Sequence, residues 1–441
     1  MKLKIEHYSK KGHGVAPIEG SSSVAEVIGA VRGDVVQVEL LKKRKKAFQT
    51  KLLSLDEPSP DRIEARCSHA GICGGCSWQQ MEYQAQLKEK MKLLTSLFDL
   101  EPLPIIPCVE PWHYRNKMEY SFSESLDGEK FLGLMQAGRK GRVLNLEECH
   151  LSPSWFIDVL KAVFEWFKKS PLHAYHQYKD LGTLRTLTLR SGNMVILTIS
   201  GNPSYFPSAK ELQLFKKSVR DVLPDASLYL RIQKIAKGSP TEFFEMHLGG
   251  SEHVEERLHV KGRELRFKLS PDSFFQPNSR QAEKLFTRAL EIAQPQKSDL
   301  VYDLYCGTGT LGMIFAPYVQ KVIGVELSHY AVCDAEVNLK LNEIENVTIL
   351  QGDVGSVLSK QEVRPDLVLL DPPRPGLTPK ALEHLLRLSP KKILYISCNP
   401  RTQKENILVL SEGGYQLQLL QGVDQFPHTV HLETIALLEK R

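Results

Sequence analysis

The stretch VYDLYCGTGT, residues 301–310, runs from an apolar, β-branched strand into a glycine-containing turn that opens a helix. Its glycines allow a tight turn and let a ligand approach the backbone closely. The next apolar run, KVIGVE, ends in Glu326, 23 residues after Asp303. A carboxylate at the tip of the second strand of such a unit can accept hydrogen bonds from both hydroxyls of a ribose. The pattern predicts an α/β domain that binds a nucleoside.

The same loop excludes several common nucleotide sites. It lacks the lysine and the spacing of a phosphate-gripping P-loop, and it does not fit GxGxxG, so nucleoside triphosphates and dinucleotides are disfavoured. Asp353 follows the third strand, NVTILQGD, and is placed to meet the amino group of an adenine. S-adenosylmethionine has no phosphate and fits this loop better. We therefore expect a methyltransferase fold in which Asp303, Glu326 and Asp353 bind the cofactor.

The wider pattern supports this fold class. From residue 300 onward, strand-like runs such as DLVLLD and KKILYISC alternate with helical segments, which indicates a parallel sheet with crossover helices. Residues 112–270 mix strands with one or two helices, and residues 1–55 alternate short β-branched stretches with glycine turns, as in a small antiparallel barrel. The expected fold is α/β, with a C-terminal Rossmann-like methyltransferase domain, a central mixed α/β domain and an N-terminal OB-like β-barrel.

The expected domain limits follow from breaks in the pattern. The polar segment DEPSPDR, residues 56–62, reads as a linker. Residues 79–98 carry apolar side chains at helical spacing, and this helix could pack on the catalytic domain. The predicted domains are residues 1–56, 60–270 and 271–441.

Composition and charge narrow the class of protein. The chain of 441 residues is 42% hydrophobic and has no apolar run long enough to cross a bilayer, so we expect no membrane partner. Its first residues show no export signal, so we expect a cytoplasmic protein. We also expect a monomer. Eight cysteines are too few for a disulfide scaffold. Residues 1–51 hold eleven Lys and Arg against five Asp and Glu, whereas the whole chain is at +5. This basic end suits a nucleic acid, although charge alone fits a solvated face equally well.

Two further strand tips carry reactive groups. DLVLLDPPRPG places Asp371 at the carboxyl end of the fourth strand, and KKILYISCNP places Cys398 at the end of the fifth. Ligands of open α/β sheets bind at this edge. A thiolate beside a methyl donor suggests attack on carbon 6 of a uracil, which makes carbon 5 nucleophilic enough to accept the methyl group. On position alone, a cysteine such as Cys398 is more often a buried structural residue.

Such a reaction needs a base, because the methylated adduct keeps a proton on carbon 5. The segment DQFPHTVHLETIALL supplies Glu433, with His428 and His431 nearby. Burial can tune the pKa of a carboxylate for this task. Glu433 could also be an ordinary residue at the start of the last strand.

Together these pieces resemble one family, the RNA uracil-5-methyltransferases that carry an iron-sulfur cluster, and most closely the branch acting on bacterial 23S ribosomal RNA. The matching motifs are SFFQPNS at 273–279, DLYCGTGT at 303–310, GVE at 324–326, DPPRPG at 371–376, ISCNPRT at 396–402 and FPHTVHLE at 426–433. The resemblance implies Cys398 as nucleophile and Glu433 as proton-abstracting base. It implies that Gln276, Tyr305, Glu326 and Asp371 are parts of the donor and target pocket, and we expect Asp303, Gly307, Thr310 and Asp353 to bind the cofactor as well. Thr310 stands where some members have Asn.

A cysteine-rich segment forms a second candidate site. RCSHAGICGGCSWQQ places Cys67, Cys73 and Cys76 in a C-x5-C-x2-C pattern. Thiolates at this spacing suit zinc as well as an iron-sulfur cluster. The resemblance implies a 4Fe-4S cluster with Cys149 as the fourth ligand, and we assign the cluster to folding and RNA positioning.

The resemblance also implies an RNA partner. The N-terminal barrel, with LLKKRKK at 40–46, is similar to the RNA-binding TRAM domain of this family. WHYRNKMEYSF, residues 112–122, interleaves aromatic and basic side chains that could stack on unpaired bases or simply enter the core. The predicted product is 5-methyluridine in 23S ribosomal RNA.

Three alternatives remain at this point. The same reaction could act on a transfer-RNA uridine, or the chain could be a non-catalytic iron-sulfur protein that binds RNA. RNA cytosine-5 methylation usually needs a second cysteine after the fourth-strand proline, where this chain has Arg374.

Overall fold

The computed structural model describes residues 1–139, 141–235 and 241–441. They form two compact units. Unit 1 comprises Met1–Gln86, Glu110–Glu252 and His428–Val430, and unit 2 comprises Leu87–Val109, His253–Pro427 and His431–Arg441. Among the described residues, no helix has the length and apolar character needed to cross a membrane.

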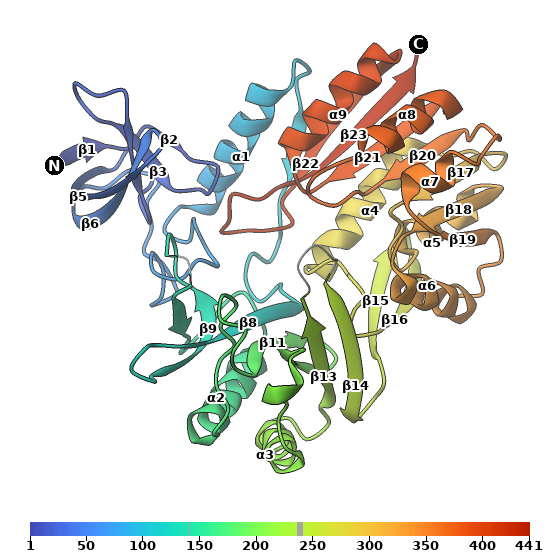
Figure 1. Cartoon of the computed structure of the whole chain (residues 1–441). Helices are drawn as coiled ribbons and strands as arrows, with labels where there is room; N and C mark the ends of the chain where they lie inside the picture. Colours follow the sequence, from blue (N-terminus) through green and yellow to red (C-terminus); the bar gives the residue numbers. More distant parts are fainter. Residues whose placement is uncertain (140, 236–240) are drawn as a thin grey trace. The chain divides into compact units, whose positions relative to one another are not determined.

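A six-stranded sheet with the strand order β1-β5-β6-β4-β3-β2 forms the N-terminal part of unit 1 (Figure 1). Its strands are β1 Lys2–Lys4, β2 His7–Tyr8, β3 Gly14–Pro17, β4 Val24–Val27, β5 Val35–Arg44 and β6 Ala47–Glu57. Alternate residues of β5, Val36 and Val38, are buried with Leu3 and Ile5 in one small core. Period-two patterning in the sequence therefore does mark strands here. An OB-like closure of this sheet remains a prediction.

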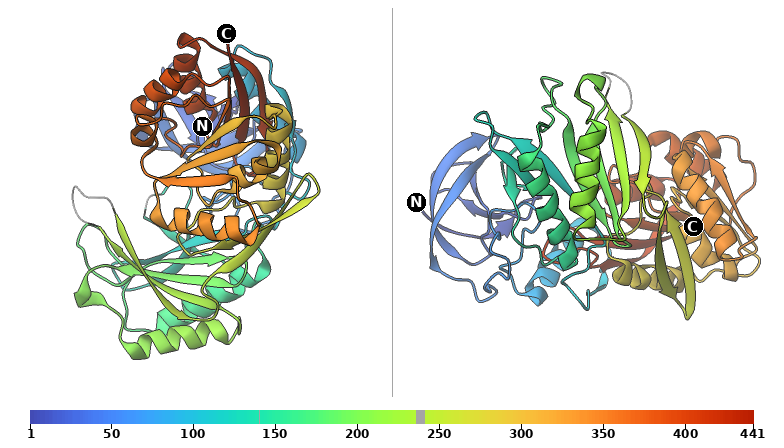
Figure 2. Two further views of the ribbon diagram at one scale, coloured as in Figure 1. Left: turned by 90° about the vertical axis from the view of Figure 1, so that its right-hand side faces the viewer. Right: turned by 90° about the horizontal axis from the view of Figure 1, so that it is seen from below.

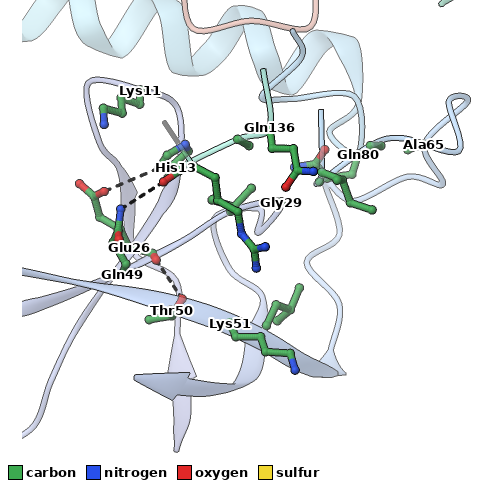
Figure 3. Close-up of a pocket in the computed structure, with 18 of the residues that line it drawn as sticks. Lys11, His13, Glu26, Gly29, Gln49, Thr50, Lys51, Ala65, Gln80 and Gln136 are labelled. Atoms are coloured by element: carbon green, nitrogen blue, oxygen red, sulfur yellow. Dashed lines mark hydrogen bonds and ion pairs between the residues drawn. The ribbon is translucent and has the colours of Figure 1, made fainter. Parts of the chain in front are cut away.

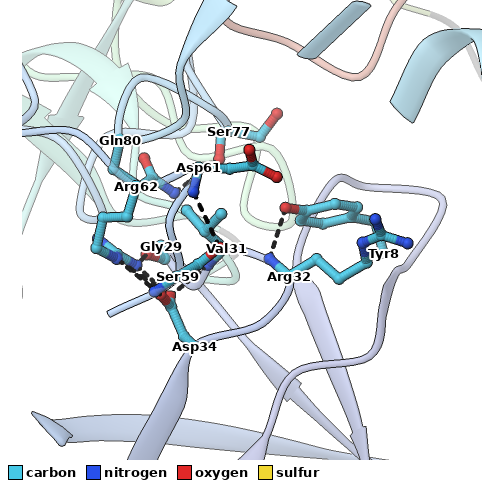
Figure 4. Close-up of polar contacts among 10 residues, drawn as sticks. All are labelled: Tyr8, Gly29, Val31, Arg32, Asp34, Ser59, Asp61, Arg62, Ser77 and Gln80. Carbon is cyan, nitrogen blue, oxygen red and sulfur yellow. Dashed lines mark hydrogen bonds and ion pairs between the residues drawn. The ribbon is translucent and has the colours of Figure 1, made fainter. Parts of the chain in front are cut away.

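A buried carboxylate ties the segment after β6 to this sheet (Figure 4). Asp34 is fully buried and accepts hydrogen bonds from the backbone N–H groups of Val31 at 2.6 Å and Ser59 at 2.8 Å. The Arg62 guanidinium binds the same carboxylate at 2.6 Å and also donates to the Gly29 carbonyl at 2.8 Å. Because each oxygen of the buried charge is satisfied, the segment over residues 59–62 is held to the sheet.

A seven-stranded sheet with the order β10-β9-β8-β11-β12-β13-β14 forms the rest of unit 1. Its strands are β8 Lys117–Glu124, β9 Lys130–Met135, β10 Val143–Asn145, β11 Leu184–Arg190, β12 Met194–Ser200, β13 Ser227–Lys234 and β14 Glu242–Gly249. Helices α2 (Ser154–Lys169) and α3 (Ala209–Arg220) lie on one face of it (Figure 2). Their apolar stripes, including Phe156 and Phe215, share one core with the sheet. A short 3-10 helix, Pro203–Tyr205, precedes α3.

Unit 2 is built on an eight-stranded sheet with the order β19-β18-β17-β20-β21-β23-β22-β7. Its strands are β7 Leu103–Ile106, β17 Leu300–Leu304, β18 Lys321–Glu326, β19 Val347–Gln351, β20 Leu367–Leu370, β21 Lys392–Ser397, β22 Tyr415–Val423 and β23 Glu433–Lys440. β17 to β21 are parallel, as the sequence predicts, and β23 runs antiparallel between β21 and β22. The strand order reverses between β17 and β20, which is where such sheets bind ligands.

Helices cover both faces of this sheet. They are α1 Tyr83–Leu97, α4 Ser279–Ala293, α5 Thr310–Phe315, α6 His329–Leu341, α7 Val354–Leu358, α8 Pro379–Leu388 and α9 Pro400–Glu412, with a 3-10 turn at Ala316–Tyr318. Leu94 and Phe98, at the end of α1, pack with α7, α8 and α9 against β17 and β21. Right-handed crossovers put α5 and α6 on the opposite face. A hairpin of β15 Val254–Val260 and β16 Arg263–Leu269 contacts α4 and α6.

The compact units do not follow the domain limits expected from the sequence. The β15–β16 hairpin belongs to unit 2, although it falls within the expected central domain, residues 60–270. Residues 87–109 also belong to unit 2. Compactness does not by itself define a domain, so the limits at 56 and 270 remain predictions.

The Asp34 network yields a stability prediction. Asp34→Ala leaves Arg62 without its buried partner, and losing one partner of such a pair costs about 3–5 kcal/mol of folding free energy. We expect faster tryptic cleavage after Arg62 under native conditions, measured by mass spectrometry. Asp56→Ala is the control, because Asp56 bonds to Lys2 and Gln37 near the surface, where water screens the interaction. Equal cleavage rates in the two variants would contradict this role of Asp34.

Candidate functional site

The loop after β17 has a backbone that few residues adopt. Tyr305 has φ +64°, in the left-handed region, and Gly307 and Gly309 have φ +55° and +77°. Gly309 is the N-cap of α5. A non-glycine residue with positive φ costs free energy and is retained where the surrounding structure enforces it. The turn brings the end of β17 directly to the start of α5.

Asp303 joins the strand to this helix. Its Oδ2 accepts a hydrogen bond from the Gly312 N–H at 2.8 Å, and a Cβ at Gly312 would lie 3.0 Å from the same oxygen. The side chain is 1% exposed, and Oδ1 has no hydrogen-bond partner among the described residues. Burial raises the pKa of Asp303 to about 7, and the charges of Asp371 and Glu326 add to this. A buried carboxyl oxygen with no partner is suited to accept a hydrogen bond from a ligand.

Glu326 and Asp353 follow the next two strands. The two Glu326 oxygens accept from the Gly307 N–H at 3.0 Å and the Ser328 N–H at 2.8 Å, which fixes the carboxylate beside the glycine loop. Asp353 caps α7, because its Oδ1 accepts from Ser356 N at 2.9 Å. Each carboxylate oxygen can accept more than one hydrogen bond, so both groups keep capacity for a ligand.

The remaining cofactor residues predicted from the sequence lie in the same unit. Burial, with the Asp353 charge, raises the pKa of Tyr305 to about 12, so Tyr305 lies near Asp353. Thr310 is the first residue of α5, and its hydroxyl lies 3.1 Å from that of Thr308. Gln276 is buried, and its Oε1 accepts from Gln425 Nε2 at 3.4 Å. The contacts of Gln276 that are described do not link it to the glycine loop.

Strand pairing brings the predicted nucleophile and base together. β21 and β23 are antiparallel with Ser397 opposite Thr434, so Cys398, the next residue after β21, comes opposite Glu433 at the start of β23. Glu433 is 3% exposed, and its Oε2 has no hydrogen-bond partner among the described residues. Cys398 is half-buried. Two residues far apart in the sequence therefore meet because of one strand register.

Asp371 lies with Glu433 and the Cys398 thiol in a cluster of three acidic groups at these strand ends. Burial raises the pKa of Glu433 to about 8, and the Asp371 charge adds to this. Burial also raises the pKa of Asp371 to about 7. The pKa of the Cys398 thiol is raised to about 11 by burial and by the charges of Glu433 and Asp371. Neighbouring acids in a desolvated site cannot all ionise, so protons are shared among them near neutral pH.

The sequence predicts an ionised Cys398, and the structure favours the neutral thiol in the free protein. Burial, which a sequence does not display, is the main cause. A neutral thiol must lose its proton as it attacks, and a neighbouring carboxylate can accept that proton. The cluster can therefore supply a nucleophile and a base for chemistry on a bound ring.

The sequence analysis did not assign Arg374 to this site. Its positive charge lowers the pKa values of both Cys398 and Glu433, against the effect of burial. Its backbone carbonyl accepts hydrogen bonds from Asn399 Nδ2 at 3.3 Å and Thr402 Oγ1 at 3.1 Å, which tie it to the start of α9. Its place directly after Pro373, in the DPPRPG motif, was the signal that could have revealed it.

The cysteine-rich segment forms a separate site in unit 1. The Gly74 N–H donates to the Met135 carbonyl at 2.9 Å, and a Cβ at Gly74 would lie 2.8 Å from that oxygen. The Gly75 N–H donates to Cys73 Sγ at 3.4 Å. Side chains at the two glycines would separate this loop from β9, so the CGGC sequence is needed for its close packing.

The four predicted ligands of the cysteine site influence one another. Burial raises the pKa values of Cys73 to about 11 and of Cys76 to about 12, and the charge of Cys149 contributes to both. The pKa of Cys67 is also raised by burial and by the charges of Glu148 and Cys149. Thiols that raise one another's pKa values favour binding a metal centre, which stabilises the thiolates.

His69 and Glu148 were not predicted to join this site. Among the described residues, the group of possible metal-binding side chains with ligand atoms all within 4.8 Å of one another is Cys67, His69 and Glu148. The His69 Nδ1 lies 3.7 Å from Cys67 Sγ, and Glu148 accepts from the Ser68 N–H at 2.7 Å. Both residues stand within two positions of a predicted cysteine ligand, which was the available signal.

The aromatic residues of the segment 112–122 divide between core and surface. Tyr120 and Phe122 are buried in the core of the seven-stranded sheet. Trp112 is partly exposed, stacks on His428 with ring centroids 3.8 Å apart and has the Arg66 guanidinium 5.3 Å from its ring. Part of the segment therefore serves packing, and Trp112 remains available at the surface.

Comparison with known proteins gives consistent results. A model of the tRNA (uracil-5-)-methyltransferase family matches residues 82–441. An uncharacterized RNA methyltransferase of Protochlamydia amoebophila is 47% identical over 439 residues, covering 94% of this chain and 99% of that protein. One of Caldanaerobacter subterraneus subsp. tengcongensis is 34% identical over 448 residues, covering 99% and 98%. The crystal structure of Pyrococcus abyssi tRNA (uracil-54, C5)-methyltransferase in complex with S-adenosyl-L-homocysteine shares the fold, with a TM-score of 0.72 at 23% identity, covering 99% of this chain and 100% of that one.

The raised pKa of Glu433 predicts a pH-dependent stability. Since its pKa is about 8 in the folded protein and 4.5 in the unfolded chain, the folded state holds the proton more tightly, and wild-type stability falls as pH rises through this interval. Glu433→Gln stays neutral and avoids this loss, which amounts to at most about 4 kcal/mol between about pH 5 and pH 8. We expect the variant to gain melting temperature over wild type at the higher pH.

Differential scanning calorimetry at both pH values measures this gain. Glu412→Gln is the matched control, because Glu412 is exposed at the end of α9. A melting-temperature difference between Glu433→Gln and wild type that is the same at both pH values would rule out the raised pKa.

Proposed function

The chain belongs to the tRNA (uracil-5-)-methyltransferase family, and from that premise we propose that it methylates carbon 5 of a uridine in 23S ribosomal RNA through a covalent bond between Cys398 and the base. Membership establishes an S-adenosylmethionine-dependent RNA methyltransferase. The observation that carries the rest is the register of β21 and β23, which sets Cys398 opposite Glu433, whose buried Oε2 has no hydrogen-bond partner among the described residues.

The cofactor fits the carboxyl edge of the unit 2 sheet. Within the described parts of the chain, the buried Asp303 Oδ1 has no hydrogen-bond partner, and Glu326 and Asp353 present carboxylates at the next two strand ends. Carboxylates suit the hydroxyl and amino groups of a nucleoside. In this proposal Glu326 holds the ribose, Asp353 the adenine amino group, and Gly307 and Tyr305 shape the loop around them. S-adenosylmethionine supplies an electrophilic methyl group when bound.

The chain's own residues make carbon 5 reactive. The Cys398 sulfur adds to carbon 6 of the uracil, and the thiol proton passes to a neighbouring carboxylate at the strand ends. The ring then becomes an enolate with electron density on carbon 5. After carbon 5 is methylated, Glu433 removes the proton that remains there. The electron pair of that C–H bond forms the C5–C6 double bond, and the C6–S bond breaks to release Cys398. The pKa of Glu433, about 8, suits a group that accepts a proton near neutral pH.

Two RNAs compete as the target. The cysteine pattern and the N-terminal sheet support the ribosomal assignment by resemblance, whereas the matching family is described by its action on tRNA. The target base must leave its stack to reach Cys398, which is easiest in an unpaired loop of either RNA.

We further propose that Cys67, Cys73, Cys76 and Cys149 bind a 4Fe-4S cluster. Four thiolates around one zinc ion would lie about 3.8 Å apart, since Zn–S is about 2.3 Å. No three of these thiols belong to a described group with ligand atoms all within 4.8 Å of one another. The ligands of a cubane are farther apart, because iron and sulfide ions lie between them. The choice of a cluster over zinc rests on the C-x5-C-x2-C pattern and on the resemblance to the iron-sulfur branch of the family.

Trapping the adduct tests the reaction. Glu433→Gln should add to carbon 6 and complete methyl transfer but fail to remove the carbon 5 proton, so that RNA stays attached to the protein in denaturing gels. Cys398→Ala should attach no RNA, whereas Cys333→Ala, at an exposed cysteine, should behave as wild type. Sequencing the attached RNA identifies the target.

Attached 23S ribosomal RNA supports the assignment, and attached tRNA replaces it by the second candidate. Wild-type protein should be trapped likewise by RNA carrying 5-fluorouridine, because fluorine does not leave as a cation. If neither trap gives an adduct, the covalent mechanism is wrong.

Metal analysis tests the cysteine site. Protein purified without oxygen should carry about four irons per chain, because four thiolates hold one cubane. Cys149→Ser should lose most of this iron, and Cys333→Ser should keep it. Stoichiometric zinc without iron in the wild-type protein would refute the cluster.

A further inference from the structure

A large cavity opens in unit 1 beside the cysteine site (Figure 3). Its volume is about 1030 Å³. Its walls come from the six-stranded sheet, from residues 62–72 and from residues 136–139. Small-molecule pockets typically measure about 300–1,000 Å³, so this one is large enough for part of a polymer.

Three cations on its walls have no ion-pair partner within the described parts of the chain: Lys11, Lys51 and Arg139. All three are exposed. Lys11 and Lys51 lie on either side of His13 and Glu26 in the view of Figure 3. Unpaired cations around a cavity attract a polyanion through its phosphates.

The other charges of the lining offset these cations only in part. Arg62 is bound to Asp34, and the Glu26 carboxylate lies 3.6 Å from His13 Nδ1. Burial lowers the pKa of His13, with the Glu26 charge opposing this, so His13 is mostly neutral at neutral pH. Glu26 and Glu64 are the acidic residues of the lining, against three exposed cations, so the lining still carries a net positive charge. The balance favours an anionic ligand.

Apolar and amide groups lie between the cations. Ile72 is 52% exposed and Leu41 50%, and both line the cavity. The Gln49 and Gln136 amides also line it, and each can donate and accept hydrogen bonds. A basic groove with apolar surface and amide groups matches the backbone, faces and edges of unpaired nucleotides.

Residues 136–139, which form one wall of the cavity, are hydrogen-bonded to the cysteine-rich segment. The Ala137 N–H donates to the Ile72 carbonyl at 2.8 Å, and Cys73 pairs with Gln136 in an isolated β-bridge. On the other side, a Cβ at Gly138 would lie 2.9 Å from Ile28 Cδ1, so the wall also packs tightly against the sheet. The position of Arg139 therefore depends on the conformation around Cys73.

We propose that this cavity binds a single-stranded segment of the RNA substrate, with phosphates at Lys11, Lys51 and Arg139, and that the cysteine site holds the wall that carries Arg139. RNA as the ligand rests on the family assignment, and the control of the wall rests on the proposed cluster. An acidic protein segment would satisfy the charges but would not need the amides.

The salt dependence of RNA binding tests the cavity. The triple variant Lys11→Gln, Lys51→Gln, Arg139→Gln should lower the slope of log affinity against log salt by about 2, because each phosphate contact on a single strand contributes about 0.7. Fluorescence anisotropy with a labelled oligouridylate measures the slope. The matched control, Lys169→Gln, Lys210→Gln, Lys216→Gln, removes the same charge from exposed or partly exposed ends of α2 and α3, outside the cavity.

A triple variant with the slope of the control would overturn the cavity as an RNA site. The proposal would also be overturned if poly-glutamate, but not unlabelled RNA, displaced the labelled oligouridylate from the wild type. That result would reassign the cavity to an acidic protein. Formation of 5-methyluridine by the wild type, assayed in parallel, separates these outcomes from a failure of the proposed function.

The variant Cys73→Ser tests whether the cysteine site holds the cavity wall that carries Arg139. Its RNA slope should fall by about 0.7, the share of one phosphate contact, because only Arg139 is displaced. Its affinity for S-adenosylhomocysteine, measured by calorimetry, should be unchanged, because the cofactor residues belong to unit 2. A wild-type slope in iron-free Cys73→Ser would overturn the link between the cysteine site and the cavity.

Discussion

Burial of carboxyl groups at one edge of a sheet is the constraint on which unit 2 depends. Asp303, Asp371 and Glu433 are withdrawn from water at neighbouring strand ends, and the pKa of each is raised to about 7 or 8. An unpaired buried charge is costly, so these groups are kept near the boundary between their neutral and ionised forms. The same desolvation that opposes folding at higher pH makes these carboxyls useful as proton acceptors near neutral pH.

The sequence predicts the catalytic fold well where local patterns report on it. Parallel strands buried on both faces are continuous apolar runs, and DLVLLD and KKILYISC are recognisable for that reason. The strand-tip positions of Asp371 and Cys398 follow from the same runs. Their proximity to Glu433 does not, because it depends on an antiparallel strand pairing between distant segments.

The sequence did not predict features that depend on contacts between segments far apart in the chain. β7 is four residues long, has Pro104 within it and pairs with β22 more than three hundred positions later, so no local pattern assigns it to the methyltransferase sheet. The effect of Arg374 on Cys398 likewise arises from a distance between two segments, which a motif does not encode. The raised pKa of Cys398 reflects its depth in the protein, which residue order alone does not give.

The inclusion of β7 and α1 in unit 2 also bears on how this architecture can be rearranged. β7 lies against β22, and Lys90 of α1 makes a buried ion pair of 2.6 Å with Asp424, just beyond that strand. Unit 2 is therefore discontinuous in sequence, and a cut before residue 271 would remove an edge strand and one partner of a buried charge pair. A gene fragment that begins at residue 271 therefore encodes β22 without β7 and Asp424 without Lys90. Recombination can exchange the pieces of this protein only by carrying both ends of the interrupted unit together.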